Sequence, residues 1–219
     1  MKLSPSEENY LKAIYHLEQA SDTGVTTNAL AQRMETKPSS ATDMVKRLAE
    51  KELLHYVRYR GVTLTNEGTK SALQIIRKHR LWQVFLVEKL HFHWDQVAEI
   101  AEQLEHVHSE ELIARLERFL GEPDFDPHGE PIPSKDGTIK QTAKKLLAEL
   151  KKNQGGVCVG VKESSPEFLQ YLDKKNITIG TKIKVLGKEF FDGSMVILVG
   201  KDQSFISKKT AENLYVQTL

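Results

Sequence analysis

The stretch "TTNALAQRMETKPSSATDMVKRLAEKEL" (residues 26–53) decides the fold of the N-terminal part of the chain. It predicts a short helix whose apolar residues face inward, with Thr27 or Asn28 as its cap. "ETKP" breaks this helix, and a second helix restarts at Pro38, because proline is favoured in the first turn of a helix. Two short helices joined by a tight turn are typical of a helix-turn-helix.

The sequence on either side of this stretch completes the same unit. "PSEENYLKAIYHLEQA" (5–20) predicts a helix with Ser4 as its N-cap. "LLHYVRYRGVTLTNEG" (53–68) alternates apolar and polar residues around "RYRG", which predicts a β-hairpin with Gly61 at the bend. The helices alone are equally compatible with a small packing unit that binds nothing. The basic hairpin favours a winged helix-turn-helix DNA-binding domain over residues 1–65.

Several polar and basic side chains of this unit are candidates for contacts with DNA. Short or flexible groups on the exposed side of the 38–52 helix are suited to base edges and phosphates, namely Ser39, Ser40, Thr42 and Lys46. At the tip of the hairpin, Arg58 and Arg60 are suited to the DNA backbone. The segment from Lys37 to Arg60 holds six basic and three acidic residues, which fits an anionic partner.

The rest of the chain divides into three further regions. Residues 66–138 predict three helices followed by a loop rich in proline and glycine, and their apolar faces are candidates for a dimer contact around Leu81, Phe85, Leu112, Leu116 and Phe119. Residues 139–154 predict a basic linker helix. Residues 155–219 read as short strands with glycine turns and one helix, which indicates a small, partly open β-barrel. The predicted fold class is therefore mainly α with β.

"AEQLEHVHSEE" (101–111) raises the question of a metal site. On a helix Glu102, Glu105 and His106 occupy one flank, and this mixture of oxygen and nitrogen ligands suits Mn²⁺, Fe²⁺ or similar ions better than Ca²⁺. His79 on the preceding helix is a candidate fourth ligand. Taken alone, the pattern is more often a solvated acidic face.

A different class of function is also compatible with the spacing. Glu88-x-x-His91 and Glu105-x-x-His108 match the pairs used by di-iron carboxylate proteins in helical bundles, so the alternative is an oxidase-type enzyme. The pattern indicates that the helix ends near His91, which argues against this alternative. The single cysteine, Cys158, excludes a disulfide framework within one chain and a multi-cysteine zinc site. No apolar run approaches the roughly 20 residues needed to cross a bilayer.

In combination, four features resemble the diphtheria-toxin-repressor family of metal-dependent transcriptional repressors. They are the winged helix-turn-helix, "RKHR" (77–80), "EHVHSEE" (105–111) and "DPHGEPIP" (126–133), followed by a small β-domain in the same order over essentially the whole chain. The resemblance implies a homodimer that binds double-stranded operator DNA when Mn²⁺ or Fe²⁺ is bound. It also implies that the C-terminal domain is SH3-like.

The resemblance also implies a set of ligands. The matching positions of the main site are Glu102, Glu105, His106 and His79, and the N-terminal helix would add Asn9. Glutamate at position 102, where the iron-sensing branch has cysteine, favours manganese. At the family's ancillary site this chain has Gln83, Ala98 and Ser164, none of which is a typical metal ligand, and Glu167 remains as a possible ligand.

We therefore expect a cytoplasmic, dimeric, metal-activated repressor of metal-ion homeostasis with no catalytic residues. We expect no membrane partner and no small-molecule substrate. The expected domains are the winged helix-turn-helix (1–65), a helical dimerisation and metal-binding domain (66–138), a linker helix (139–154) and the SH3-like domain (155–219).

Overall fold

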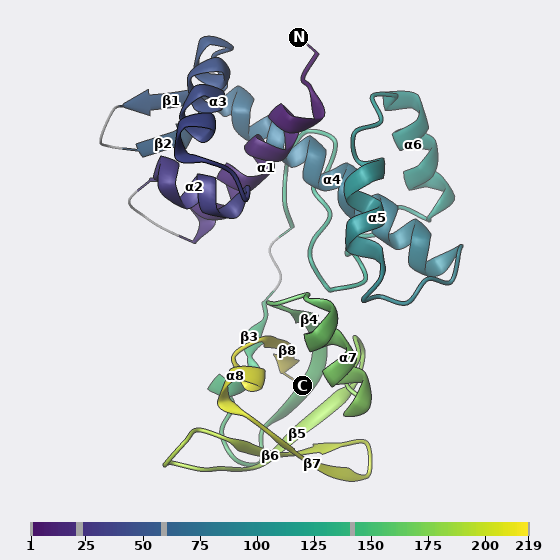
Figure 1. Cartoon of the computed structure of the whole chain (residues 1–219). Helices are drawn as coiled ribbons and strands as arrows, with labels where there is room; N and C mark the ends of the chain where they lie inside the picture. Colours follow the sequence, from purple (N-terminus) through teal and green to yellow (C-terminus); the bar gives the residue numbers. More distant parts are fainter. Residues whose placement is uncertain (1, 21–23, 58–60, 141–142, 219) are drawn as a thin grey trace. The chain divides into compact units, whose positions relative to one another are not determined.

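The computed structural model describes residues 2–20, 24–57, 61–140 and 143–218, which form two compact units (Figure 1). The first unit comprises the chain up to His79 together with Glu102–Glu110 and Pro133–Ile139. The second comprises Arg80–Ala101, Glu111–Ile132 and the chain from Lys140 onward. Among the described residues, no helix has both the length and the apolar character needed to span a bilayer.

The first unit opens with α1 (Pro5–Gln19), whose start follows the prediction. The Ser4 hydroxyl accepts a hydrogen bond from the Glu7 N–H at 3.3 Å, and the Glu7 carboxylate accepts one from the Ser4 N–H at 2.9 Å. This reciprocal pair is a capping box, which satisfies two backbone donors that the first turn of a helix leaves free.

The helix-turn-helix consists of α2 (Thr27–Arg33) and α3 (Pro38–Glu50). The predicted cap of α2 was wrong by one position, because the hydroxyl that accepts the Ala29 N–H, at 3.1 Å, belongs to Thr26. The second helix begins at Pro38 as predicted. The buried residues of the three helices and the hairpin form one core that includes Leu11, Ile14, Leu30, Val45, Leu48 and Val62.

The hairpin pairs β1 (Leu54–Val57) with β2 (Gly61–Leu64) in antiparallel register. Its predicted bend residue, Gly61, has a φ of +96°, a left-handed conformation that glycine adopts without strain. Val25, just before α2, makes an isolated bridge to Val62 and so ties the hairpin to the helices. The tip that carries Arg58 and Arg60 lies outside the described residues.

Three helices follow, namely α4 (Asn66–Glu88), α5 (Val97–Leu104) and α6 (Glu110–Phe119). The α5 helix ends earlier than predicted, so that Glu105 and His106 lie in the turn after it. Two of the predicted dimer contacts were also wrong, because Leu81 and Leu116 are buried within the second unit of one chain. In the same unit Leu112 and Phe119 are exposed, and Phe85 packs against Phe119 with ring centroids 6.4 Å apart.

The loop after α6 is held by the buried carboxylate of Asp126. It accepts hydrogen bonds from the backbone N–H groups of His128 (2.8 Å) and Glu130 (2.9 Å). Burial raises the pKa of Asp126, although the nearby Arg80 guanidinium acts in the opposite direction. The His128 ring hydrogen-bonds the carbonyl of Trp94 through Nε2 at 2.9 Å. The loop is therefore an ordered part of the second unit.

The remainder of the second unit is an antiparallel sheet of six strands in the order β3-β8-β4-β5-β6-β7. The strands are β3 (Lys145–Leu146), β4 (Gly155–Val161), β5 (Lys182–Lys188), β6 (Met195–Val199), β7 (Asp202–Ile206) and β8 (Leu214–Thr218). Two helices accompany them, α7 (Pro166–Lys174) and α8 (Lys208–Ala211). In the described part of the chain the sheet does not close, which leaves β3 and β7 as its edges. Register shifts in β4 and β5 bend the sheet around its core.

The predicted linker helix over 139–154 was wrong. The described residues of this segment form β3 and a single 3₁₀ turn, Leu147–Glu149, and no α-helix. Leu147 and Leu150 are buried in the core of the sheet domain, and β3 pairs with β8. Tertiary packing of these two leucines has overridden the helical propensity of the segment.

Candidate metal centre

His79, Glu102 and Glu105 come together in the first unit. Each offers one ligand atom, and these atoms lie within 4.8 Å of one another. Within the parts of the chain that the structure describes, this is the one such group of three histidine, cysteine or carboxylate side chains. His79 lies on α4, Glu102 on the last turn of α5 and Glu105 just beyond it, so residues distant in sequence share the site.

The ammonium group of Lys12, on α1, lies between the two carboxylates. Its Nζ is 2.5 Å from Glu102 Oε2 and 2.6 and 2.8 Å from the two oxygens of Glu105. The Lys12 side chain is 14% exposed and that of Glu105 is fully buried. Lys12 could not be predicted at this site from the sequence, because its partners lie 90 or more positions away.

Glu105 is buried with its charge compensated. Burial acts to raise its pKa, but the hydrogen bond with His79 Nδ1 at 2.6 Å and the positive charge of Lys12 outweigh burial, so that the pKa lies below its usual value. A buried carboxylate without such partners would be strongly destabilising. The solvated acidic face that the sequence alone favoured therefore does not describe Glu105.

His106 belongs to a neighbouring cluster. Its Nδ1 lies 2.5 Å from a carboxylate oxygen of Glu8, which is itself buried on α1. Lys78 and His108 approach the other Glu8 oxygen at 3.6 and 3.7 Å. When Nδ1–H donates to a carboxylate, the Nε2 lone pair is left to bind a metal, which is the usual arrangement around ligating histidines. Glu8 thus fixes the orientation of the His106 ring, and it was not identified from the sequence.

The remaining predicted ligands have different surroundings. The side-chain oxygen of Asn9 is buried and has no hydrogen-bond partner in the described structure. A buried acceptor without a donor is costly, so this atom is suited to receive a cation. Glu167 lies exposed in the first turn of α7, within the second unit, and is not part of the group of three. Ala98 is exposed and has no ligand atom.

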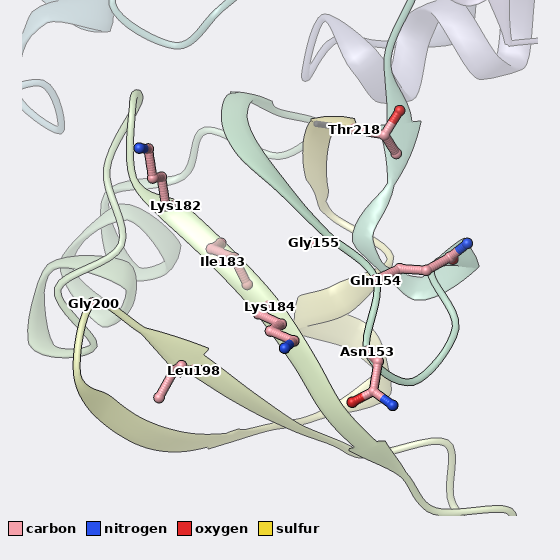
Figure 2. A pocket seen from close by; sticks show the side chains of 9 residues that line it. All are labelled: Asn153, Gln154, Gly155, Lys182, Ile183, Lys184, Leu198, Gly200 and Thr218. Carbon is pink, nitrogen blue, oxygen red and sulfur yellow. The ribbon is translucent and has the colours of Figure 1, made fainter.

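A cavity of about 510 Å³ in the sheet domain is not a second metal site. It lies along β5 and neighbouring strands, and Figure 2 shows Lys182 and Lys184 projecting from β5, with Gly155, Leu198 and Thr218 contributing to the lining from other strands. Its lining contains no carboxylate, imidazole or thiol group. Lysine ammonium groups repel cations, so the charge of this cavity is wrong for a metal ion.

The residues of the first unit fit a divalent transition ion. The two carboxylates already hold one positive charge, that of Lys12. The imidazoles and the Asn9 oxygen supply further ligand atoms of intermediate hardness.

The alternative di-iron arrangement lacks one of its two Glu-x-x-His pairs. Glu88 is exposed at the last position of α4, and His91 lies beyond the helix with a φ of +57°. The Glu-x-x-His spacing at 88–91 therefore does not lie on one helical face.

The predicted DNA-contacting residues of α3 lie mainly on its exposed face. Ser39, Ser40 and Lys46 are exposed, and Thr42 is half-buried. The Thr42 hydroxyl donates to the Pro38 carbonyl at 2.8 Å, and Lys46 lies 3.6 Å from the exposed carboxylate of Asp43. Both interactions are local and solvent-accessible, so they are weak enough to be exchanged for contacts with another molecule.

Comparison with known families matches three consecutive regions of the chain. The description "Iron dependent repressor, N-terminal DNA binding domain" matches residues 2–62. "Iron dependent repressor, metal binding and dimerisation domain" matches residues 65–134, and "FeoA domain" matches residues 145–218.

Individual relatives agree with these matches. A helix-turn-helix-type transcriptional regulator of Methanocaldococcus jannaschii is 36% identical over 118 residues, which cover 54% of this chain and 94% of the relative. The iron-dependent repressor IdeR of Mycobacterium leprae is 34% identical over 131 residues, which cover 60% of this chain and 56% of that protein. The solved structure of a manganese-dependent transcriptional repressor in complex with manganese is 31% identical, with a TM-score of 0.87, and covers 97% of this chain and 100% of that one.

Proposed function

Because the chain belongs to the diphtheria-toxin-repressor family of metal-dependent transcriptional repressors, we propose that it represses transcription by binding operator DNA when Mn²⁺ or Fe²⁺ is bound. The proposed ligands are His79, Glu102, Glu105, His106 and Asn9. The genes controlled would serve metal-ion homeostasis. Glutamate at position 102 is a harder ligand than the cysteine that the iron-sensing branch of the family has there, so it favours manganese over iron.

The observation that carries this proposal is the double role of α1. On one side, Leu11 and Ile14 are fully buried in the core that also holds α2 and α3. On another side, α1 presents Lys12 and Asn9 to the carboxylate site. A bound divalent ion would supply two positive charges at the carboxylate pair. The position of α1, and with it the DNA-reading helix, therefore depends on what neutralises Glu102 and Glu105.

The coupling between metal and DNA must be reciprocal. If metal favours one position of α1 and DNA favours the same one, each ligand tightens the binding of the other by the same factor. Such couplings are typically about 1–3 kcal/mol, or roughly 5- to 150-fold in affinity. Operator affinity measured at saturating metal would then exceed that in chelator by a factor in this range.

We further propose a homodimer that places two winged helices on one operator. Two units spaced by about one helical turn of DNA, near 34–36 Å, would give the specificity that a single unit lacks. The exposed Leu112 and Phe119 on α6 are the candidates for this contact.

The proposed domains are a DNA-binding domain (1–65), a dimerisation and metal-binding domain (66–138) and an SH3-like domain (155–219). A protein that acts on operator DNA in this way would work in the cytoplasm, without catalytic residues, a small-molecule substrate or a membrane partner.

The test is operator binding measured in chelator, in Mn²⁺ and in Fe²⁺, with a DNA fragment selected from a random pool in the presence of metal. Calorimetric titration with Mn²⁺ is run in parallel on the wild type and on Glu105→Ala. Glu67→Ala, which removes an exposed carboxylate ion-paired to Lys70 at 2.9 Å, is the matched control. We expect Glu105→Ala alone to lose Mn²⁺ binding and metal-dependent DNA binding. Equal operator binding by the wild type in chelator and in saturating Mn²⁺ would contradict the proposal.

The DNA interface has its own test. Replacing Lys46 by alanine should weaken binding to all sequences and reduce the slope of log K against log salt by about 1, because each phosphate contact releases one counterion. Arg58→Ala and Arg60→Ala are expected to do the same at the wing. Lys201→Ala, an exposed lysine of the sheet domain, is the control and should leave the slope unchanged. A salt slope that Lys46→Ala does not alter would remove α3 from the phosphate contacts.

A further inference from the structure

Lys12 occupies the position of a cation at the carboxylate pair. Its three contacts with Glu102 and Glu105 are 2.5–2.8 Å long, as short as or shorter than charge-assisted N–H···O hydrogen bonds usually are, so both carboxylates hold the ammonium closely. The other ligand of the group, His79, contacts the same Glu105 from α4. The ammonium therefore sits among the oxygen atoms that a divalent ion would need.

We propose that Lys12 is a built-in competitor for the metal, a tethered monovalent cation that must leave the carboxylates before a divalent ion can bind there. This inference rests on the proposed function, since it concerns the same site. An ammonium has no lone pair and cannot itself ligate a metal ion, so both cannot occupy the carboxylate oxygens together. Lys12 thereby raises the metal concentration at which the protein responds.

The structure provides a place for the displaced side chain. A cavity of about 250 Å³ lies beside the site, and its lining includes Asn9, Lys12, Met34, Glu35 and Glu102. Glu35, in the turn between α2 and α3, is exposed and offers a carboxylate on the wall of this cavity. A lysine stem of four methylene groups can swing from one carboxylate to another without moving the backbone. Displacement would transfer the ammonium from the metal site toward the helix-turn-helix.

Calorimetric titration with Mn²⁺ on the full chain tests the competition. Lys12→Met removes the charge and keeps most of the stem, Lys12→Arg keeps the charge, and Lys70→Met removes an exposed, ion-paired lysine elsewhere in the same unit. We expect Lys12→Met to bind Mn²⁺ roughly tenfold more tightly or better, since two close carboxylates would then lack a counter-charge. Lys12→Arg and Lys70→Met should bind no more tightly than the wild type. Equal or weaker binding by Lys12→Met would overturn the inference.

A second measurement needs no variant, in case Lys12→Met does not fold without metal. The wild-type protein is acetylated at its lysines with an amine-reactive ester, with and without saturating Mn²⁺, and each site is quantified by mass spectrometry. Labelling of Lys12 should rise several-fold with Mn²⁺ as its ion pairs are broken, while Lys70 stays constant. Unchanged or reduced labelling of Lys12 would overturn the inference although Mn²⁺ binds. A wild type that binds neither Mn²⁺ nor Fe²⁺ would instead overturn the proposed function, and the inference with it.

Discussion

Replacing Gly129 by alanine should destabilise the second unit far more than the same change at Gly121. Both glycines have a left-handed backbone, with φ of +79° and +77°. An alanine at either position pays the cost of that conformation, about 1–2 kcal/mol. A Cβ at Gly121 would meet no atom within 4 Å, so this cost is all that Gly121→Ala adds.

At Gly129 the added carbon has no room. It would lie 1.9 Å from the carbonyl oxygen of Val159 and 2.5 Å from the Cα of Gly160. These atoms belong to β4, whose Gly160 and Val161 pair with Tyr215 and Leu214 of β8, and this pairing holds the strand in place beside the loop. The loop must withdraw instead, which breaks the hydrogen bond from the Val161 N–H to the His128 carbonyl at 3.0 Å. Leaving such buried groups unpaired costs about 1–3 kcal/mol.

The expected loss of unfolding free energy is therefore about 1–2 kcal/mol for Gly121→Ala and roughly 2–5 kcal/mol for Gly129→Ala. Urea denaturation followed by tryptophan fluorescence measures both, since Trp94 stacks on His128 and is buried in the core of the sheet domain. If Gly129→Ala loses no more stability than Gly121→Ala, the packing of this loop on β4 does not contribute as described.

Three further changes have definite expected outcomes. Ser4→Ala removes one side of the capping box and should cost about 0.5–2 kcal/mol in thermal unfolding, so an unchanged melting temperature would contradict the role of the cap. Leu48→Ala, at a fully buried position on the inner face of α3, should cost about 2–5 kcal/mol of unfolding free energy, measured by thermal unfolding followed by circular dichroism. Burial raises the pKa of the Cys158 thiol from 9.0 to about 11, so at pH 8 it should not react with a thiol reagent until the protein is denatured. Since this pKa is higher in the folded state, its contribution to stability is fully present below about pH 9 and is lost as the pH rises toward 11, a loss that Cys158→Ala should remove.

Local signals in the sequence predicted most of the local structure, apart from the cap of α2, which is Thr26. Ser4 and Pro5 located the start of α1, Pro38 located the start of α3, and Gly61, predicted for the bend of the hairpin, is the first residue of β2 and has a φ of +96°. Each depends on a preference of one residue for a particular backbone position, which the chain expresses regardless of what packs around it. The three helices predicted within residues 66–138 are present as α4, α5 and α6, and the region 155–219 holds short strands and the helix α7, as predicted.

Features that depend on distant partners were missed. Residues 139–154 have good helix formers, but the burial of Leu147 and Leu150 in the sheet domain cannot be read from their neighbours in the sequence. β8 (Leu214–Thr218) was not predicted, although it is the strand that joins β3 to β4. At the candidate site Glu102 and Glu105 come together as predicted, but Glu105 lies in the turn after α5, and His106, predicted for the same flank, contacts Glu8 instead. Helical phase gave no indication that Glu105 is fully buried, because the compensating charge comes from α1.

The edge strand β7 limits which residues the sequence can have there, for a reason unrelated to the binding of metal or DNA. A terminal strand such as β7 presents backbone groups that another extended chain can pair with, which is a route to aggregation. Phe190, Phe191 and Phe205 are exposed in the sheet domain, and Phe205 lies on β7 itself. The strand is only five residues long and carries Asp202 at its start, and short length and charge are both known to discourage such pairing. The charge of Asp202 would then oppose edge-to-edge aggregation of the protein at high concentration.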